Sequence, residues 1–365
     1  MRFFKGLKEA KAEFLTILII LLSVRVAESF PASGSSLSAQ ELQLPEPSVD
    51  AVIEHVRAFS SFGSRVTGYD GCRITAGYIA SVLESYGLDV KKHNYTVVVS
   101  VDEGSELTLI FRNGTSITLK AYALWPNGID PSPTAPGGLK GPLLYAGSGS
   151  LGEFNGKLVD GAVVLMDYES GGNWLNAAKL GAKAVVFIGP DQIPPYFEAL
   201  AKFLDTPLNF PRLYVPPSYS NLLKSAAQQG VSVVVNSKIT WKTVEATNVI
   251  GVLKGSTNDT IVLSAHYDSW SVVPALASSA HEALAPATLL ELAKILSTQK
   301  PYRTVWFVFF SGHWQALAGA REFVESYYFG PKVASGLFKP VMLVNVGHLD
   351  PKGFGLRARQ AEMPS

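Results

Sequence analysis

The sequence predicts an α/β protein in which a mixed sheet is flanked by helices and a small β/α domain is inserted. Three observations predict this class. Strand-like and helix-like patterns alternate along the C-terminal part of the chain. Two of its strands, 260–265 and 304–310, are continuous apolar runs, as expected where both faces of a sheet are covered. A stretch dense in Pro and Gly, Trp125–Gly141, separates two regions of such patterns.

Length and composition fit two folded units behind a leader. The chain has 365 residues, of which 47% are hydrophobic, enough for sizeable cores. We expect a first part of the larger unit over 48–125, the insert over 126–240 and the rest of the larger unit over 241–365. A net charge of +1 provides no field that would recruit nucleic acid. The lone Cys72 cannot form an internal disulfide.

The first unit opens with two amphipathic helical patterns between Val49 and Tyr86, and Gly87 is a stop signal. The stretch Asp89–Val101 alternates and is rich in β-branched residues, which predicts a strand. Two further strands, 107–110 and 117–119, flank the turn-forming pair Asn113-Gly114 and predict a hairpin.

The sequence of the inserted unit predicts strands with a helix between two of them. Apolar runs at 143–145, 162–166 and 184–188 predict strands, and 173–180 predicts a helix between the last two. Val231–Trp241 is a further β-rich run.

The C-terminal region predicts strands at 248–253, 260–265, 304–310 and 341–346, with helices at 285–296 and 316–327. A histidine stands at or just past three of the strand ends: His266, His313 and His348. Ligands of open α/β sheets bind beyond the carboxyl ends of the strands, so this edge is the candidate site.

The N-terminus has the layout of an export signal. Four basic residues within 2–11 precede the apolar run Phe14–Val24, which is shorter than the roughly 20 residues that a membrane-spanning helix needs. We expect residues 1–28 to be a signal peptide or an uncleaved anchor and 29–47 to be a linker. The protein is then exported, either extracellular or attached to a membrane with its domains outside the cytoplasm.

Several ordered segments carry a resemblance to a known family. The chain resembles the M28 family of zinc exopeptidases, including members with an inserted protease-associated (PA) domain. Phe62–Gly68 is similar to an early family segment that contains an Arg. The insert matches at 141–145, 156–165 and 177–185, and the core matches at 248–255, 266–268, 289–293, 303–310 and 317–321.

The resemblance implies a site built on two zinc ions, a bridging aspartate and a glutamate general base. His266 matches the first metal ligand, and Asp268 matches the acidic residue that orients it. His281 takes the place of the bridging aspartate, with Glu282 beside it as the nearest carboxylate. A neutral imidazole has one lone pair for a metal and cannot bridge two ions as a carboxylate can.

The chain departs from the family at further positions. His313 and Trp314 replace a Glu-Glu pair, so His313 takes the place of the general base, and Trp314 offers no metal ligand. Gly347 stands where an acidic ligand is expected, next to His348. The family's last metal-binding histidine lies well downstream, so 241–365 is expected to form an incomplete peptidase-like core.

The resemblance therefore implies three functional alternatives. The protein is an impaired or inactive peptidase homologue that binds a peptide or protein ligand, an active zinc exopeptidase with an altered site, or a truncated fragment. If any zinc binds, we expect at most one ion, held by residues among His266, His281, Glu282 and His348. Trp270 and Trp314 either line an aromatic subsite or fill the volume that metals would occupy.

Overall fold

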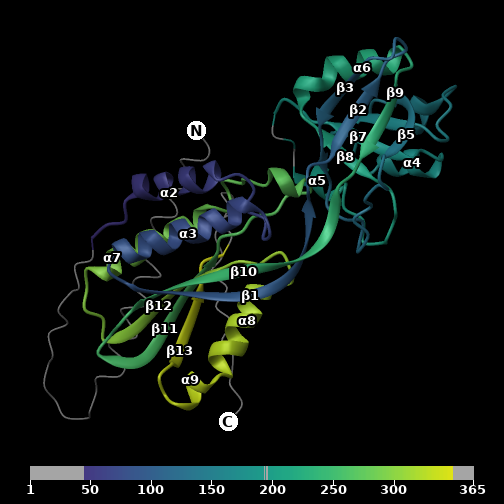
Figure 1. Ribbon diagram of the computed structural model, residues 1–365. Helices are drawn as coiled ribbons and strands as arrows, with labels where there is room; N and C mark the ends of the chain where they lie inside the picture. The colour runs from purple at the N-terminus through teal and green to yellow at the C-terminus, as the bar shows by residue number, and fades with distance from the viewer. Residues whose placement is uncertain (1–44, 193, 195, 348–365) are drawn as a thin grey trace, which may run out of the picture.

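The structure, a computed structural model, describes residues 45–192, 194 and 196–347. They form two units side by side, each built on one β-sheet (Figure 1). The expected leader at 1–28, most of the linker at 29–47 and His348 lie outside the described residues. Within the described ranges, no helix is both long and apolar enough to span a bilayer.

The sheet of the first unit is mixed, in the order β1-β10-β12-β11-β13. β11 runs parallel to β12 and β13, whereas β10 is antiparallel to β1 and β12. Its strands are β1 (Asp89–Asp102), β10 (Ile239–Leu253), β11 (Thr257–His266), β12 (Arg303–Phe310) and β13 (Lys339–Asn345).

Helices cover both faces of this sheet. One face packs on α2 (Val49–Ser61), α3 (Asp70–Ser85) and α7 (Leu284–Ser297). The other face packs on α8 (Ala318–Phe323) and the π-helical turn η4 (Val324–Tyr328). It also packs on the loop between α9 (Pro331–Ala334) and β13. β12 contributes to the cores on both faces of the sheet, because its successive side chains point to opposite faces. Phe307 and Phe309 enter the first core, and Trp306 and Val308 enter the second. This double burial explains why the strand is apolar throughout.

The second unit holds an eight-stranded mixed sheet in the order β3-β2-β9-β5-β6-β7-β8-β4. Its strands are β2 (Glu106–Ile110), β3 (Ser116–Lys120), β4 (Tyr122–Ala123), β5 (Leu139–Tyr145), β6 (Val163–Asp167), β7 (Ala184–Ile188), β8 (Arg212–Val215) and β9 (Ser232–Asn236). Its helical segments are η1 (Leu151–Phe154), α4 (Trp174–Lys179), α5 (Tyr196–Leu200), η2 (Pro217–Tyr219) and α6 (Ser220–Gln228). α4 and α6 contribute to two different cores, which contain alternate residues of β6 and β7.

A buried ion pair ties two segments of the second unit together. Lys202, whose side chain is fully buried, donates from Nζ to Glu198 Oε2 (3.1 Å) and to the carbonyl of Gly171 (2.9 Å). The Gly171 N–H in turn donates to Glu198 Oε2 (2.9 Å). The ammonium lies 4.9 Å from the ring centre of Tyr168 and 5.3 Å from that of Phe187. Burial lowers the pKa of Lys202, and the hydrogen bond to Glu198 opposes that shift.

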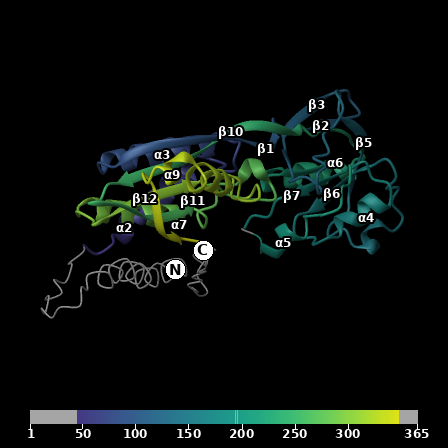
Figure 2. The same ribbon diagram turned by 90° about the horizontal axis from the view of Figure 1, so that it is seen from below.

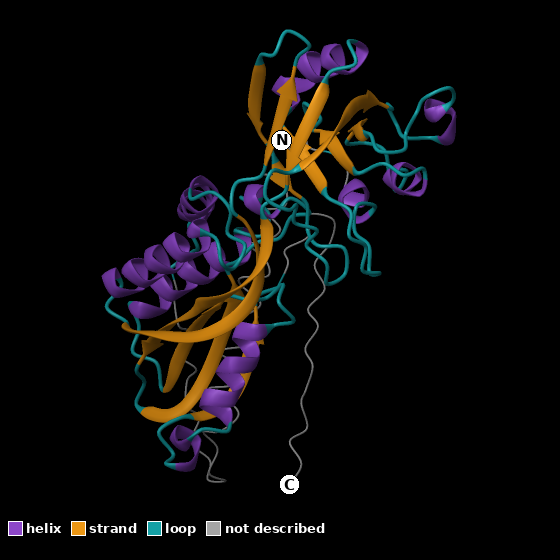
Figure 3. Ribbon diagram, turned by 45° about the vertical axis from the view of Figure 1, so that its right-hand side comes forward, coloured by secondary structure: helices purple, strands orange, loops and turns teal. Residues whose placement is uncertain are grey.

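A two-stranded ribbon joins the units. β1 and β10 stay paired from Asp89↔Val252 to Asp102↔Ile239, and the ribbon runs out of the first sheet towards the second unit (Figures 2 and 3). The chain enters the second unit after β1 and returns from it through β10. The residues between β1 and β10 are therefore connected along the chain to the first unit through one end of this ribbon.

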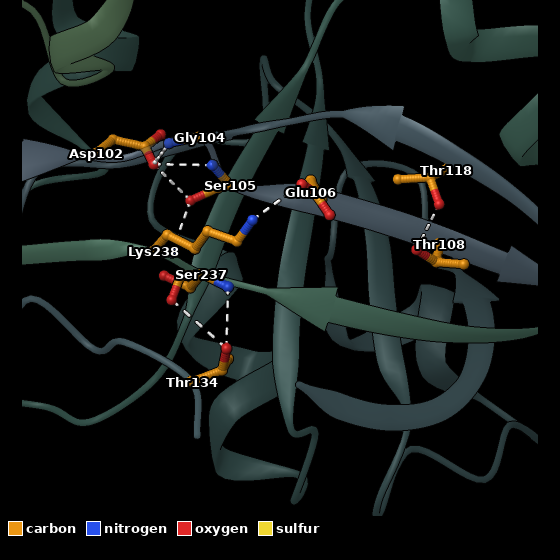
Figure 4. A network of polar contacts seen from close by, with 9 residues as sticks. All are labelled: Asp102, Gly104, Ser105, Glu106, Thr108, Thr118, Thr134, Ser237 and Lys238. Atoms are coloured by element: carbon orange, nitrogen blue, oxygen red, sulfur yellow. Dashed lines mark hydrogen bonds and ion pairs between the residues drawn. The ribbon is translucent and has the colours of Figure 1, made fainter. Parts of the chain in front are cut away.

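Asp102 organises that end of the ribbon (Figure 4). Its Oδ1 accepts from the N–H groups of Gly104 (3.2 Å) and Ser105 (2.9 Å) and from Ser105 Oγ (2.7 Å). Its Oδ2 accepts from the Ala123 N–H (2.8 Å). Ser105 Oγ then accepts from the Lys238 N–H (2.9 Å), so both passages of the chain share one network.

We expect Asp102→Ala to lower the free energy of unfolding by roughly 1–3 kcal/mol, because it leaves buried donors without an acceptor. Urea unfolding followed by circular dichroism measures the change. The neighbouring Glu103→Ala removes only an exposed pair with Lys242 and serves as the control. Equal stability of the two variants would contradict the role given to Asp102.

The predicted fold class is confirmed: two mixed sheets are flanked by helices. The expected helix at 316–327 is α8 continued by the π-helical turn η4, and the run 231–241 contains β9 and the start of β10. The predicted hairpin forms as β2 and β3, and it pairs with β9 in the second sheet. Alternation fixes which face of a hairpin is apolar but not which sheet it joins.

Candidate functional site

The candidate site lies at the carboxyl ends of β11 and β12. His266 is the last residue of β11 and pairs in register with Phe310 at the end of β12. Asp268 follows two residues later, and the turn after β12 brings His313 and Trp314 to the same edge. Parallel strands end at one edge of a sheet, which is why residues far apart in sequence meet here.

The imidazoles of His266 and His313 are stacked. Their ring centres are 3.9 Å apart and the planes differ by 15°. Trp314 stands nearly perpendicular to both rings, with its centre 6.4 Å from that of His266 and 5.1 Å from that of His313. His266 is buried and His313 is half-buried. Two of the three histidines expected at strand ends are therefore brought together, but face to face.

Asp268 is fully buried and fixes the turn that carries His313. Its Oδ2 accepts from the His313 N–H (2.9 Å) and from Thr67 Oγ1 (3.1 Å). Thr67 Oγ1 also accepts from the Gly312 N–H (2.9 Å). Burial raises the pKa of Asp268 to about 7, against the lowering effect of these hydrogen bonds.

Arg65 holds the loop that follows Asp268. Its guanidinium is fully buried and donates to the carbonyls of Tyr267 (3.1 Å) and Ser279 (2.7 Å). Further donations reach the carbonyls of Phe59 and Ser278. From the sequence, Arg65 was recognisable only as part of a family-like segment, and nothing indicated that its guanidinium donates to carbonyls rather than to a carboxylate.

The turn after β12 is held from its other side by two residues that the sequence analysis did not single out. Asn248 Oδ1 accepts from the Ser311 N–H (3.2 Å), and Asn248 Nδ2 donates to the Gly319 carbonyl (2.8 Å). Ser311 Oγ donates to the Thr247 carbonyl (2.9 Å). Asn248 lies within β10 and Ser311 directly follows β12; polar residues at such positions are too common to mark a site by themselves.

Among the described residues, the remaining predicted positions do not complete a group of three metal-binding side chains with His266. His281 is exposed, in the turn before α7. The neighbouring Glu282 is buried, and both of its carboxylate oxygens accept from the Trp270 N–H, at 3.2 and 3.0 Å. Burial raises the pKa of Glu282 to about 7, and the Trp270 N–H and the charge of Arg65 oppose that shift. His348 lies outside the described residues.

These residues do not fit a zinc pair. Zinc binds along the in-plane lone pair of an imidazole nitrogen at ~2.0–2.1 Å. The planes of His266 and His313 are almost parallel, so their lone pairs do not converge on one ion. Across the part of the chain that the structure describes, no three His, Cys, Asp or Glu side chains gather where an ion could be held.

The chain is similar to a family model and to individual known proteins. Residues 248–338 match the model of peptidase family M28. Over 298 residues the chain is 27% identical to the probable lipoprotein aminopeptidase LpqL of Mycobacterium tuberculosis; the match spans 76% of this chain but 55% of that relative. The zinc aminopeptidase BSAP of Bacillus subtilis is a structural neighbour, with 22% identity, a TM-score of 0.55 and coverage of 83% of this chain and 69% of BSAP.

The matched region begins in β10 and contains His266, Asp268, the loop to α7 and the turn after β12. The likeness to BSAP supports the fold. Residues 248–338 of the chain therefore resemble peptidase family M28.

Proposed function

We propose that this protein binds peptides at the strand-tip site and does not hydrolyse them by the family's two-zinc mechanism. The observation that carries the proposal is the stacked pair His266 and His313, whose rings present parallel faces instead of converging lone pairs. The match of residues 248–338 to a peptidase family supports a peptide as ligand.

Three further features support the loss of zinc chemistry. Trp314 has no atom that can bind a cation through a lone pair, yet it occupies the position of a metal ligand in the family resemblance. Glu282 is turned towards a backbone N–H. His281 projects from an exposed turn. Without an activated water the site has no nucleophile, and loss of a general base alone costs ~10²–10⁴ in rate.

We extend the proposal to location and to the second unit. The relative LpqL is described as a lipoprotein aminopeptidase, and together with the basic and apolar N-terminus this supports an exported protein. The segments 141–145, 156–165 and 177–185, now placed in one β/α unit, support a protease-associated type of domain there.

Metal content and hydrolysis test the proposal. After dialysis against zinc and then against metal-free buffer, we expect well below one zinc per chain by elemental analysis. We also expect no chelator-sensitive hydrolysis of aminoacyl p-nitroanilides, with BSAP as the positive control. Two zinc ions per chain, or hydrolysis that a chelator abolishes, would overturn the proposal.

A matched variant tests the stacking argument itself. His313→Glu combined with Trp314→Glu removes the stacked ring and supplies two carboxylates beside His266, so we expect it to retain more zinc than the natural chain. Equal zinc content in both proteins would show that the stacked rings are not what prevents binding.

A further inference from the structure

A row of aromatic side chains runs from the second unit to the strand-tip site. The ring centres are 6.3 Å apart between Trp125 and Trp270, 5.9 Å between Trp270 and Trp314, and 5.1 Å between Trp314 and His313. All four side chains are half-buried, so each keeps part of its surface accessible. We call these four residues the aromatic row.

The row crosses the junction of the units and is held there by backbone contacts. The Trp125 N–H donates to the Val272 carbonyl (2.7 Å), and Val272 and Val273 are buried in a core of the second unit. Trp270 is fixed through its N–H by Glu282. These contacts preorganise the rings, which lowers the entropic cost of binding a ligand.

The spacing of the tryptophans matches an extended peptide. An extended chain advances about 3.3 Å per residue, so side chains on one face recur about every 6.6 Å. The two steps between Trp125, Trp270 and Trp314 are close to that repeat. Offset aromatic pairs attract one another beyond the simple burial of their area.

We infer that the aromatic row binds an extended peptide segment whose alternate side chains are aromatic or large and apolar. This rests on the proposed peptide binding and adds the ligand's class and conformation. The row reaches beyond the histidines to Trp125 of the second unit, which places that unit in ligand selection. Peptide binding at the aromatic row requires neither a free peptide terminus nor a metal.

Two isomeric peptides test the spacing. In one blocked pentapeptide three phenylalanines alternate with two serines; in the other the phenylalanines are consecutive and the serines follow. Composition, charge and blocked ends are identical, so only the spacing differs. By isothermal titration calorimetry we expect the alternating isomer to bind roughly tenfold more tightly. Equal affinity would overturn the inference and leave peptide binding standing, and binding of neither isomer would also overturn it.

Substitutions in the aromatic row test whether the peptide binds there. Trp270→Leu and Trp314→Leu keep apolar bulk but lose the flat ring, so each should abolish most of the preference for the alternating isomer. Trp314→Phe should retain it. Trp241→Leu is the control, because Trp241 is 41% exposed on β10 and its indole N–H donates to the Ile129 carbonyl (2.8 Å). Thermal unfolding confirms that each variant is folded. An unchanged preference in both leucine variants would contradict the assignment.

Zinc content and peptide spacing are separate readouts. A chain that retains two zinc ions and hydrolyses peptides refutes the proposed function even where the alternating isomer is preferred. A metal-free chain that binds both isomers equally refutes only the role of the aromatic row.

Discussion

Lys202→Met is expected to lower the free energy of unfolding by about 3–5 kcal/mol, because it leaves the buried Glu198 carboxylate without its cation. The variant also removes the donor to the Gly171 carbonyl and the cation that lies beside Tyr168 and Phe187. Urea unfolding followed by far-ultraviolet circular dichroism measures the loss.

A double-mutant cycle isolates the charge. Glu198→Gln combined with Lys202→Met removes both charges and keeps an amide near the Gly171 N–H, so we expect it to recover most of the stability lost in the single variant. Should the double variant be as unstable as Lys202→Met alone, the loss comes from packing around the lysine stem and not from an unpaired charge.

Gly71→Ala is the second substitution with a large expected effect. A Cβ at this position would lie 2.2 Å from the Ser64 carbonyl oxygen and 2.6 Å from that of Phe62. Both are backbone atoms of the segment that carries Arg65, so neither can move aside without displacing that segment. We expect a loss of at least about 3 kcal/mol in the free energy of unfolding.

The neighbouring Cys72 reports this change directly. Its thiol is buried, and burial raises the thiol pKa to about 12, so a thiol reagent reacts only when the start of α3 opens. Gly71→Ala should accelerate labelling strongly. Gly77→Ala in the same helix is the control, because a Cβ there meets nothing within 4 Å. This variant should raise the free energy of unfolding by roughly 0.5–1 kcal/mol. Similar labelling rates in the two variants would rule out the clash.

The parts of the fold that periodicity governs could be predicted from the sequence. The apolar run of β12 marks a strand covered on both faces, and the structure buries its alternate residues in two cores. The side chains of β2 and β3 alternate just as clearly, but their pairing with β9 depends on contacts more than a hundred residues apart. Local pattern carries no information about such long-range pairing.

The sequence predicted that His266 and His313 lie at one edge of the sheet, but not the geometry of their two rings. The strand ends located His266 and His313 at one edge of the sheet, since parallel strands align their carboxyl ends. The stacking of the two rings depends on the turn at Gly312 and on the hydrogen bond from the His313 N–H to Asp268. Arg65 lies 214 residues from Ser279, and Thr67 lies 201 residues from Asp268, so no local spacing pattern could reveal these two contacts.

The pairing of Asp102 with Ile239 has a consequence for the ancestry of the chain. Directly paired residues of adjacent strands lie only about 5 Å apart. A tight two-residue turn could therefore close the gap left by deleting everything between them, and the remaining chain would read as an uninterrupted hairpin. The larger unit could thus have gained or lost its companion through a single genetic event, without any rearrangement of its own strand order.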